Sequence, residues 1–121
     1  MDITLRRVTH ANFGELADLA VREDQREFVA SNAVSIMEAY TTLVEGGVAL
    51  PFGIYVGDTP VGFLMIGYDC LDWEDAPAVA RGAYCLWRLM IDARYQGRGY
   101  GRRALQQALS YIRTFPCGPS E

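Results

Sequence analysis

A short segment rich in glycine and arginine carries the clearest chemical pattern in the sequence. In the run 89–103 (LMIDARYQGRGYGRR), an apolar strand leads into a turn with three alternating glycines and three arginines, and then into a helix. Glycines let a ligand approach the backbone closely, and the N–H groups at a helix N-terminus attract anions. Arginines beside them can form charge-assisted hydrogen bonds to phosphate oxygens. The segment therefore predicts a site for a phosphate or pyrophosphate group.

The spacing of the glycines narrows the choice of phosphate ligand. It is neither the GxxxxGK[ST] pattern of a Walker-type loop nor the GxGxxG dinucleotide pattern. It is Gln-x-x-Gly-x-Gly, formed by Gln96, Gly99 and Gly101. With the strand before it and the amphipathic helix after it, this pattern resembles the acetyl-CoA loop of the GCN5-related N-acetyltransferase (GNAT) family, Arg/Gln-x-x-Gly-x-Gly/Ala. The runs LWRLMIDARYQGRGYG and EDQREFVASN resemble a bacterial branch of that family, the spermine/spermidine acetyltransferases.

The resemblance implies acetyl-CoA as co-substrate and a place for each part of it. Backbone groups of Leu89, Met90 and Ile91 would pair with the pantetheine arm like an added strand, and one of their N–H groups would polarise the thioester carbonyl. The pyrophosphate would lie against Gln96, Gly97, Arg98, Gly99, Tyr100, Gly101 and Arg102. The alternative is a tight strand-to-helix turn with solvated arginines, preceded by core side chains. Arg103 is expected at the surface.

The acceptor implied by the resemblance is a small primary amine, with a polyamine as the leading candidate. An amine with a pKa near 10.4 loses a proton at neutral pH at a cost of about 4.6 kcal/mol unless a base or the site offsets it. Asp72 and Glu74, in the acidic run DCLDWEDAP, are the candidate catalytic bases, and Trp73 between them offers a ring for a cation. Glu23 and Asp24 form a second acidic set that would bind the substrate. For each of these acids a solvated loop is the alternative.

Composition and charge exclude several other classes of protein. The 121 residues are expected to form one domain, 1–121, with a net charge of −4 that argues against nucleic-acid binding. No run approaches the roughly 20 apolar residues of a membrane span, and the N-terminus lacks a signal-peptide pattern, so a cytoplasmic location is expected. Three cysteines and the single histidine form no zinc pattern, so no metal is expected. No nucleophile–base arrangement is visible, which favours direct acetyl transfer over an acyl-enzyme.

The apolar pattern predicts the elements that position these residues. A strand over 2–8 precedes a helix with apolar positions at Phe13, Leu16, Ala17 and Ala20, and a second helix, capped by Ser31, with them at Ile36, Met37, Tyr40, Leu43 and Val44. A hairpin follows around residues 57–60, then an acidic loop over 69–82 and a buried strand over 83–91. The last element is a helix from Gly101 with apolar positions at Ala104, Leu105, Ala108, Leu109 and Ile112. The resulting order is β-α-α-β-β-β-α. This order indicates the α/β (α+β) class, and the resemblance implies a mixed, mainly antiparallel sheet. Arg88 interrupts its apolar strand and must find a partner or reach the surface.

The resemblance covers all 121 residues but only the N-terminal and cofactor-binding parts of the family's domain. In the family, another strand, a helix bearing a tyrosine that protonates the departing thiolate, and usually two more strands follow the last helix predicted here. The chain is therefore expected to be truncated before them. Two other hypotheses stay open: an acyl-CoA-binding module without turnover, and a homodimer formed through the unpaired edge of strand 83–91.

Overall fold

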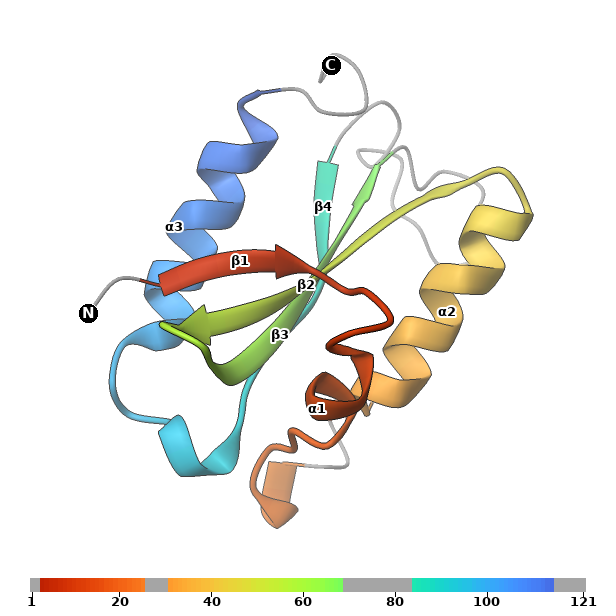
Figure 1. Ribbon diagram of the computed structural model, residues 1–121. Helices are drawn as coiled ribbons and strands as arrows, with labels where there is room; N and C mark the ends of the chain where they lie inside the picture. The colour runs from red at the N-terminus through yellow and green to blue at the C-terminus, as the bar shows by residue number, and fades with distance from the viewer. Residues whose placement is uncertain (1–2, 26–30, 69–83, 115–121) are drawn as a thin grey trace.

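The computed structural model describes residues 3–25, 31–68 and 84–114, which form a four-stranded sheet with helices against both faces (Figure 1). The elements in chain order are β1 (Ile3–Arg7), α1 (Phe13–Ala17), η1 (Glu23–Gln25), α2 (Asn32–Val44), β2 (Val48–Val56), β3 (Thr59–Tyr68), β4 (Tyr84–Ile91), η4 (Ala93–Tyr95) and α3 (Tyr100–Ile112). The predicted order and the α+β class are confirmed, and the described residues add two short 3-10 turns, η1 and η4. Within the described ranges, no helix is long and apolar enough to cross a membrane.

The sheet has the strand order β1-β2-β3-β4, and each neighbouring pair is antiparallel. The pairing of β3 with β4 contains an irregularity, because Met65 lies opposite Arg88 and Ile66 lies opposite Leu86. Trp87 is therefore the extra residue of a β-bulge. On its other edge β4 has no strand partner among the residues that the structure describes.

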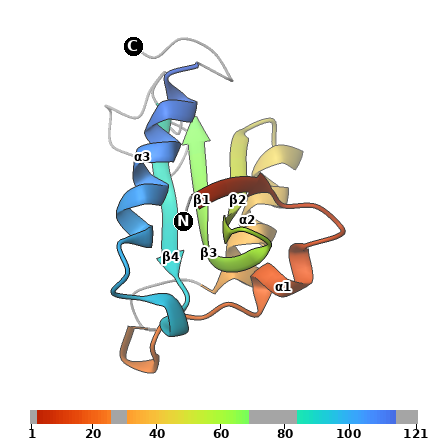
Figure 2. The same cartoon turned by 60° about the vertical axis from the view of Figure 1, so that its left-hand side comes forward.

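Two apolar clusters, one on each face of the sheet, make up the core. Ala104 and Ala108 of α3 pack in the first cluster, and Leu16 and Ala39 from α1 and α2 pack in the second. Figure 2 shows the sheet between α3 on one side and α1 and α2 on the other. Leu89 and Ile91 contact the first cluster, and Met90 belongs to the second. The last three residues of β4 thus anchor the strand from both faces of the sheet.

The bulge in β4 explains how the structure accommodates Arg88. Trp87 packs against the cluster on the α1–α2 face, and Arg88 also reaches this face, where its Nη2 donates to Glu38 Oε1 on α2 at 2.9 Å. In a regular strand two consecutive side chains would point to opposite faces. The extra residue places both on one face, so the arginine that interrupts the apolar run finds a carboxylate partner.

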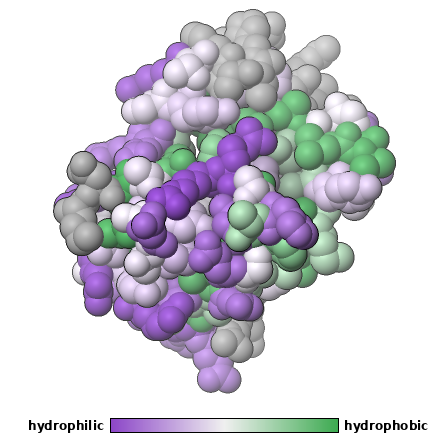
Figure 3. Space-filling model, viewed as in Figure 1, coloured by the Kyte–Doolittle hydropathy of each residue, from purple (hydrophilic) through white to green (hydrophobic). Residues whose placement is uncertain are grey.

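Apart from Ile36, which packs against the cluster on the α1–α2 face, the predicted buried face of the second helix is wrong. Its large apolar residues Met37, Tyr40, Leu43 and Val44 are more than half exposed, and Figure 3 shows apolar side chains gathered over α2. The residues that α2 buries are Asn32, Ser35 and Ala39. Small side chains let the helix lie close to the sheet, and the Asn32 amide is satisfied by donating to the Leu16 carbonyl at 2.8 Å. The Ser31 cap is confirmed, since its hydroxyl accepts from the Val34 N–H.

The other two helices differ from their predicted faces in part. In α3, Ala104 and Ala108 are fully buried and Ile112 packs against the first cluster, as predicted, whereas Leu105 and Leu109 are 38% and 44% exposed. Helix α1 ends at Ala17, before the predicted Ala20, and Phe13 at its start is 47% exposed. Leu16 is the residue of α1 that fills the core.

Candidate functional site

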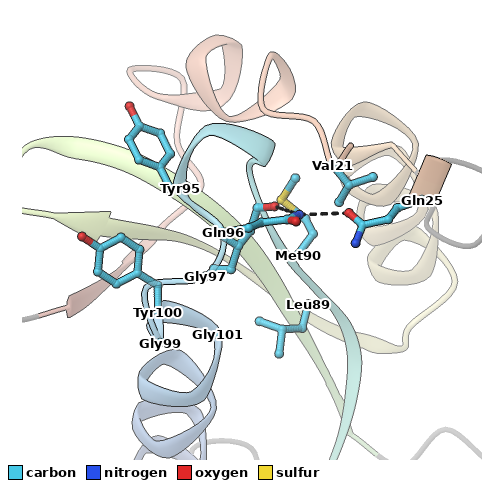
Figure 4. Close-up of a pocket in the computed structure, with 11 residues that line it drawn as sticks. Val21, Gln25, Leu89, Met90, Tyr95, Gln96, Gly97, Gly99, Tyr100 and Gly101 are labelled. Carbon is cyan, nitrogen blue, oxygen red and sulfur yellow. Dashed lines mark hydrogen bonds between the residues drawn. The ribbon is translucent and has the colours of Figure 1, made fainter. Parts of the chain in front are cut away.

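A pocket of about 530 Å³ lies where the end of β4, the β4–α3 turn and η1 meet. Eleven residues line it: Val21, Gln25, Leu89, Met90, Ile91, Tyr95, Gln96, Gly97, Gly99, Tyr100 and Gly101. Figure 4 shows Tyr95 and Tyr100 on one side of the turn, and Val21 and Gln25 on the other. Eight of the ten residues predicted to contact acetyl-CoA line this one pocket. The two others, Arg98 and Arg102, are exposed in the same turn and in the first turn of α3.

The glycines of the turn have the backbone conformation that their type allows. Gly97 and Gly99 have φ angles of 80° and 79°, in the left-handed region that strains other residues. Gly99 is also the N-cap of α3, so the N–H groups of the first turn of this 13-residue helix begin directly after it. A Cβ atom at Gly97 or Gly99 would meet no atom within 4 Å. The surface of the turn is therefore open backbone at the positive end of a helix.

Gln96, the first residue of the predicted motif, is held by two hydrogen bonds. Its Nε2 donates to the Ile91 carbonyl at 2.9 Å and to Gln25 Oε1 at 3.0 Å (Figure 4). Both hydrogens of the amide are thus directed at protein acceptors. The bond to Ile91 closes the turn on the end of β4, and the bond to Gln25 ties the turn to η1.

A buried carboxylate, Asp92, provides a second connection between these segments. Its Oδ2 accepts from the Ala20 N–H at 3.0 Å, and its Oδ1 accepts from the Arg94 N–H at 2.9 Å and from Arg94 Nε at 2.8 Å. The Ala93 N–H also donates to the Ala20 carbonyl at 2.9 Å. Burial acts to raise the pKa of Asp92, but the hydrogen bonds from Arg94 and Ala20 and the charge of Arg94 outweigh it and hold the pKa below its ordinary value.

The last residues of β4 have their side chains in the core and their backbone beside the pocket. Met90 lies opposite Phe63, and Leu89 lies opposite Leu64, across the β3–β4 pairing. The backbones of β3 and β4 lie close together at Gly62, where an added Cβ atom would lie 2.4 Å from the Met90 carbonyl oxygen. The side chains pack while one edge of the backbone faces away from β3, so the core and ligand interpretations of Leu89–Ile91 are compatible.

The acidic residues predicted for the acceptor are only partly placed. Glu23 and Asp24 are exposed on η1, directly before the pocket residue Gln25. Asp24 lies 3.4 Å from Arg22. Asp72, Trp73 and Glu74 lie outside the described residues. Among the residues that the structure describes, no group of three or more His, Cys, Asp or Glu side chains is arranged to hold a metal ion.

Four residues of the site escaped the sequence prediction. Val21 and Gln25 line the pocket from a polar stretch that gave no sign of it, Tyr95 lines it directly before the predicted motif, and Asp92 was part of an unassigned turn. The partners of Gln25 and Asp92 are 71 and 72 residues away in the chain. The one available signal was Asp92 followed two residues later by Arg94, a spacing that suits a carboxylate capping a short turn.

The structure thus has a glycine turn and a helix N-terminus at the end of β4, a strand that pairs only with β3 among the described residues. Comparison with known proteins places the chain in a family. Residues 28–119 match the Acetyltransferase (GNAT) family. The chain belongs to this family of N-acetyltransferases, whose members take the acetyl group from acetyl-CoA.

Similar proteins agree with this assignment. The chain is 32% identical over 116 residues to a spermine/spermidine N(1)-acetyltransferase of Bacillus subtilis (strain 168), covering 93% of this chain and 69% of that protein. Among solved structures, an acetyltransferase from Thermus thermophilus is 20% identical with a TM-score of 0.62, covering 91% of this chain and 69% of that one. The PaiA N-acetyltransferase from Thermoplasma acidophilum, solved in complex with coenzyme A, is 14% identical with a TM-score of 0.58, covering 94% and 74%. These two likenesses show that the fold is shared.

Proposed function

We propose that residues 1–121 act as one domain that transfers an acetyl group from acetyl-CoA directly to a primary amine of a small molecule, with a polyamine as the leading acceptor. One observation carries the proposal: the outer edge of β4, which has no strand partner among the described residues, meets a left-handed glycine turn and the N-terminus of α3 at a single pocket. These are the two surfaces that an extended thiol arm ending in a pyrophosphate needs, namely backbone groups along a strand and N–H groups around an anion.

The residues of the turn suit the pyrophosphate. The N–H groups of the glycine turn and of the first turn of α3 would donate to its oxygens, with Gly97 and Gly99 leaving the backbone uncovered. Arg98 and Arg102 are exposed beside them and would add charge-assisted hydrogen bonds. Gln96 contributes in a different way, because its side-chain amide is directed at Ile91 and Gln25. It would therefore shape the turn while the backbone makes the contacts.

The outer edge of β4 suits the pantetheine arm and the thioester. N–H and C=O groups of Leu89, Met90 and Ile91 would pair with the arm as an added strand does. One N–H of this strand would donate to the thioester carbonyl oxygen and stabilise the negative charge that develops on it. The amine nitrogen would attack the carbonyl carbon, the C–S bond would break, and a proton would pass to the departing sulfur. Because the amine reacts directly, no side chain has to carry the acetyl group.

The support for a polyamine acceptor comes from charge and from the curated relatives. Glu23 and Asp24 place two exposed carboxylates beside Gln25 at the edge of the pocket, where they would attract a cationic chain. Asp72, Trp73 and Glu74 are proposed as further acceptor residues, with Asp72 and Glu74 as the candidates that take the amine proton. Two relatives at 31–32% identity bear the names of spermine acetyltransferases.

Two measurements test the proposal. Calorimetry with acetyl-CoA measures binding, and release of free thiol in the presence of spermidine or of monoamines measures turnover. Gly99→Glu should abolish binding, because the new side chain adds negative charge to the anion site. Gly46→Glu is the matched control: Gly46 has a φ of 85° and open space around it, but it does not line the pocket, so it should bind as the unaltered protein does.

Each outcome separates one alternative. Binding together with thiol release supports the transferase, and the amine that reacts fastest identifies the acceptor class. Binding without release, with every amine tried and a folded protein, would identify a binding module instead. A folded protein that does not bind acetyl-CoA would overturn the proposal altogether.

A further inference from the structure

We propose that Gln25 is a positioning residue that acts through Gln96, so that η1 fixes the shape of the turn which receives the pyrophosphate. The assignment rests on the proposed function for what the turn binds, although the positioning itself is measurable without any ligand. Gln25 lies outside the Gln-x-x-Gly-x-Gly pattern, 71 residues before its partner.

The Gln96 side chain determines where the backbone of the turn goes. Gln96 is the C-cap of η4 and has an extended backbone, with a ψ of 157°, immediately before the left-handed Gly97. Its amide donates one hydrogen to the Ile91 carbonyl and the other to Gln25 Oε1. Without an acceptor at residue 25, one of these two half-buried hydrogen bonds is lost, and the side chain is free to rotate about the other.

Gln25 is itself held in place by its own turn. Its Oε1 also accepts from the Arg22 N–H at 3.2 Å, and its own N–H donates to the Arg22 carbonyl at 2.8 Å. Five residues earlier, Ala20 exchanges hydrogen bonds with Asp92 and Ala93. The segment 20–25 is therefore attached to the β4–α3 turn at both ends, which gives Gln25 a fixed point from which to hold Gln96.

This arrangement joins the two sides of the pocket. Glu23 and Asp24, proposed for the acceptor, belong to the same three-residue turn as Gln25, and Gln25 contacts the turn proposed for the donor. A change in the position of η1 would therefore alter both sides. Gln25 is the side chain through which such a change passes to Gln96.

Hydrogen exchange without ligand tests the positioning directly. In Gln25→Ala, the N–H groups of Tyr95 and Arg103, which donate to the carbonyls of Asp92 and Gly99 at the two ends of the turn, should exchange about 3- to 10-fold faster, the loss expected for one hydrogen bond, while those of β3 stay unchanged. Gln25→Glu should exchange like the unaltered protein, because a carboxylate still accepts from Gln96 and Arg22. Gln106→Ala, at an exposed glutamine of α3, is the matched control and should also leave the turn unchanged. Equal exchange of the turn in Gln25→Ala and Gln106→Ala would overturn the proposal.

A double-mutant cycle on the dissociation constant of coenzyme A tests the path through Gln96. Gln25→Ala and Gln96→Ala should each weaken binding about 3- to 10-fold. The double variant should bind no more weakly than Gln96→Ala alone, because Gln25 has no route to the turn once the Gln96 amide is gone. Effects that multiply would show that Gln25 acts independently and would overturn the proposal. If the unaltered protein fails to bind coenzyme A, the proposed function fails, and the exchange measurement still decides the role of Gln25.

Discussion

Replacing Asp92 with asparagine tests whether this buried carboxylate attaches the segment between α1 and η1, through Ala20, to the β4–α3 turn. Asp92 uses one oxygen for Arg94 and the other for the Ala20 N–H. Asparagine has a single acceptor oxygen, so its NH₂ group would face the Ala20 N–H, which is another donor. A buried donor without an acceptor costs about 1–3 kcal/mol, and the loss of a charged acceptor adds to it. We expect Asp92→Asn to lower the free energy of unfolding by about 2–3 kcal/mol.

Urea or thermal unfolding measures this loss. With an unfolding entropy of about 2.1 cal/mol/K per residue, a chain of 121 residues should lose about 8–12 °C in Tm. Asp58→Asn is the matched control, because the Asp58 side chain is 99% exposed and lies 3.0 Å from Arg6 in a surface pair. The free energy of unfolding of Asp58→Asn should fall by less than about 1 kcal/mol. Equal losses in the two variants would refute the role assigned to Asp92.

The pH dependence of stability tests the part played by the charge of Asp92. Burial raises the pKa of Asp92, but Arg94 and Ala20 lower it by more, so the folded protein holds this pKa below the ordinary value of 3.8. A carboxyl group with a lowered pKa stabilises the folded state fully above its unfolded pKa, and this contribution disappears as the pH falls through the folded pKa. The difference in stability between the unaltered protein and the Asp92→Asn variant should therefore be constant near neutral pH and narrow below about pH 4. A difference that stays constant down to about pH 2 would show that charge is not involved.

Three further predictions concern single positions. Gly99→Ala should destabilise the fold by about 1–2 kcal/mol because of its left-handed φ, whereas Gly101→Ala, whose Cβ atom would lie 3.7 Å from Ile91, should be neutral or stabilising in urea unfolding. Gly62→Ala should lower stability by about 1–3 kcal/mol, since its Cβ atom would meet a backbone carbonyl of β4, and amide exchange in β4 should quicken. Burial and the Glu15 hydrogen bond raise the pKa of Tyr55 to about 12. The stability contributed by its neutral form should therefore be lost as the pH rises from 10 to 12. In thermal unfolding, the Tyr55→Phe variant should not show this loss.

The parts of the site that could be predicted from sequence are those fixed by local geometry. This turn between a strand and a helix has two left-handed residues, and both are glycines, Gly97 and Gly99, which adopt that conformation without strain. A serine before an amphipathic segment caps it, and Ser31 does so. The same local reasoning predicted the order of strands and helices. In each case the physical cause lies within a few residues of the signal, so the pattern and the structure agree.

The parts that escaped prediction depend on contacts between distant segments. A helical period showed that α2 has an apolar side, but not that the sheet would take the side with Asn32 and Ala39. The choice depends on how closely the helix approaches β2 and on an acceptor at Leu16 for the Asn32 amide. In the sequence, Gln25 likewise has nothing to distinguish it from the other polar residues of its acidic stretch. Its role becomes visible only in the fold, where Gln96 lies beside it.

The shape of the β4–α3 turn depends on residues on both sides of it. Its glycines permit the conformation, but glycine alone leaves a chain free to adopt many others. Asp92 fixes the start of the turn against Ala20, and the Gln96 amide fixes its middle between Ile91 and Gln25. A turn held in this way would lose less conformational entropy on binding an anion. A larger part of the free energy of each hydrogen bond to the anion would therefore contribute to the affinity. Substitutions at the supporting residues should therefore weaken binding without removing any group that contacts the ligand.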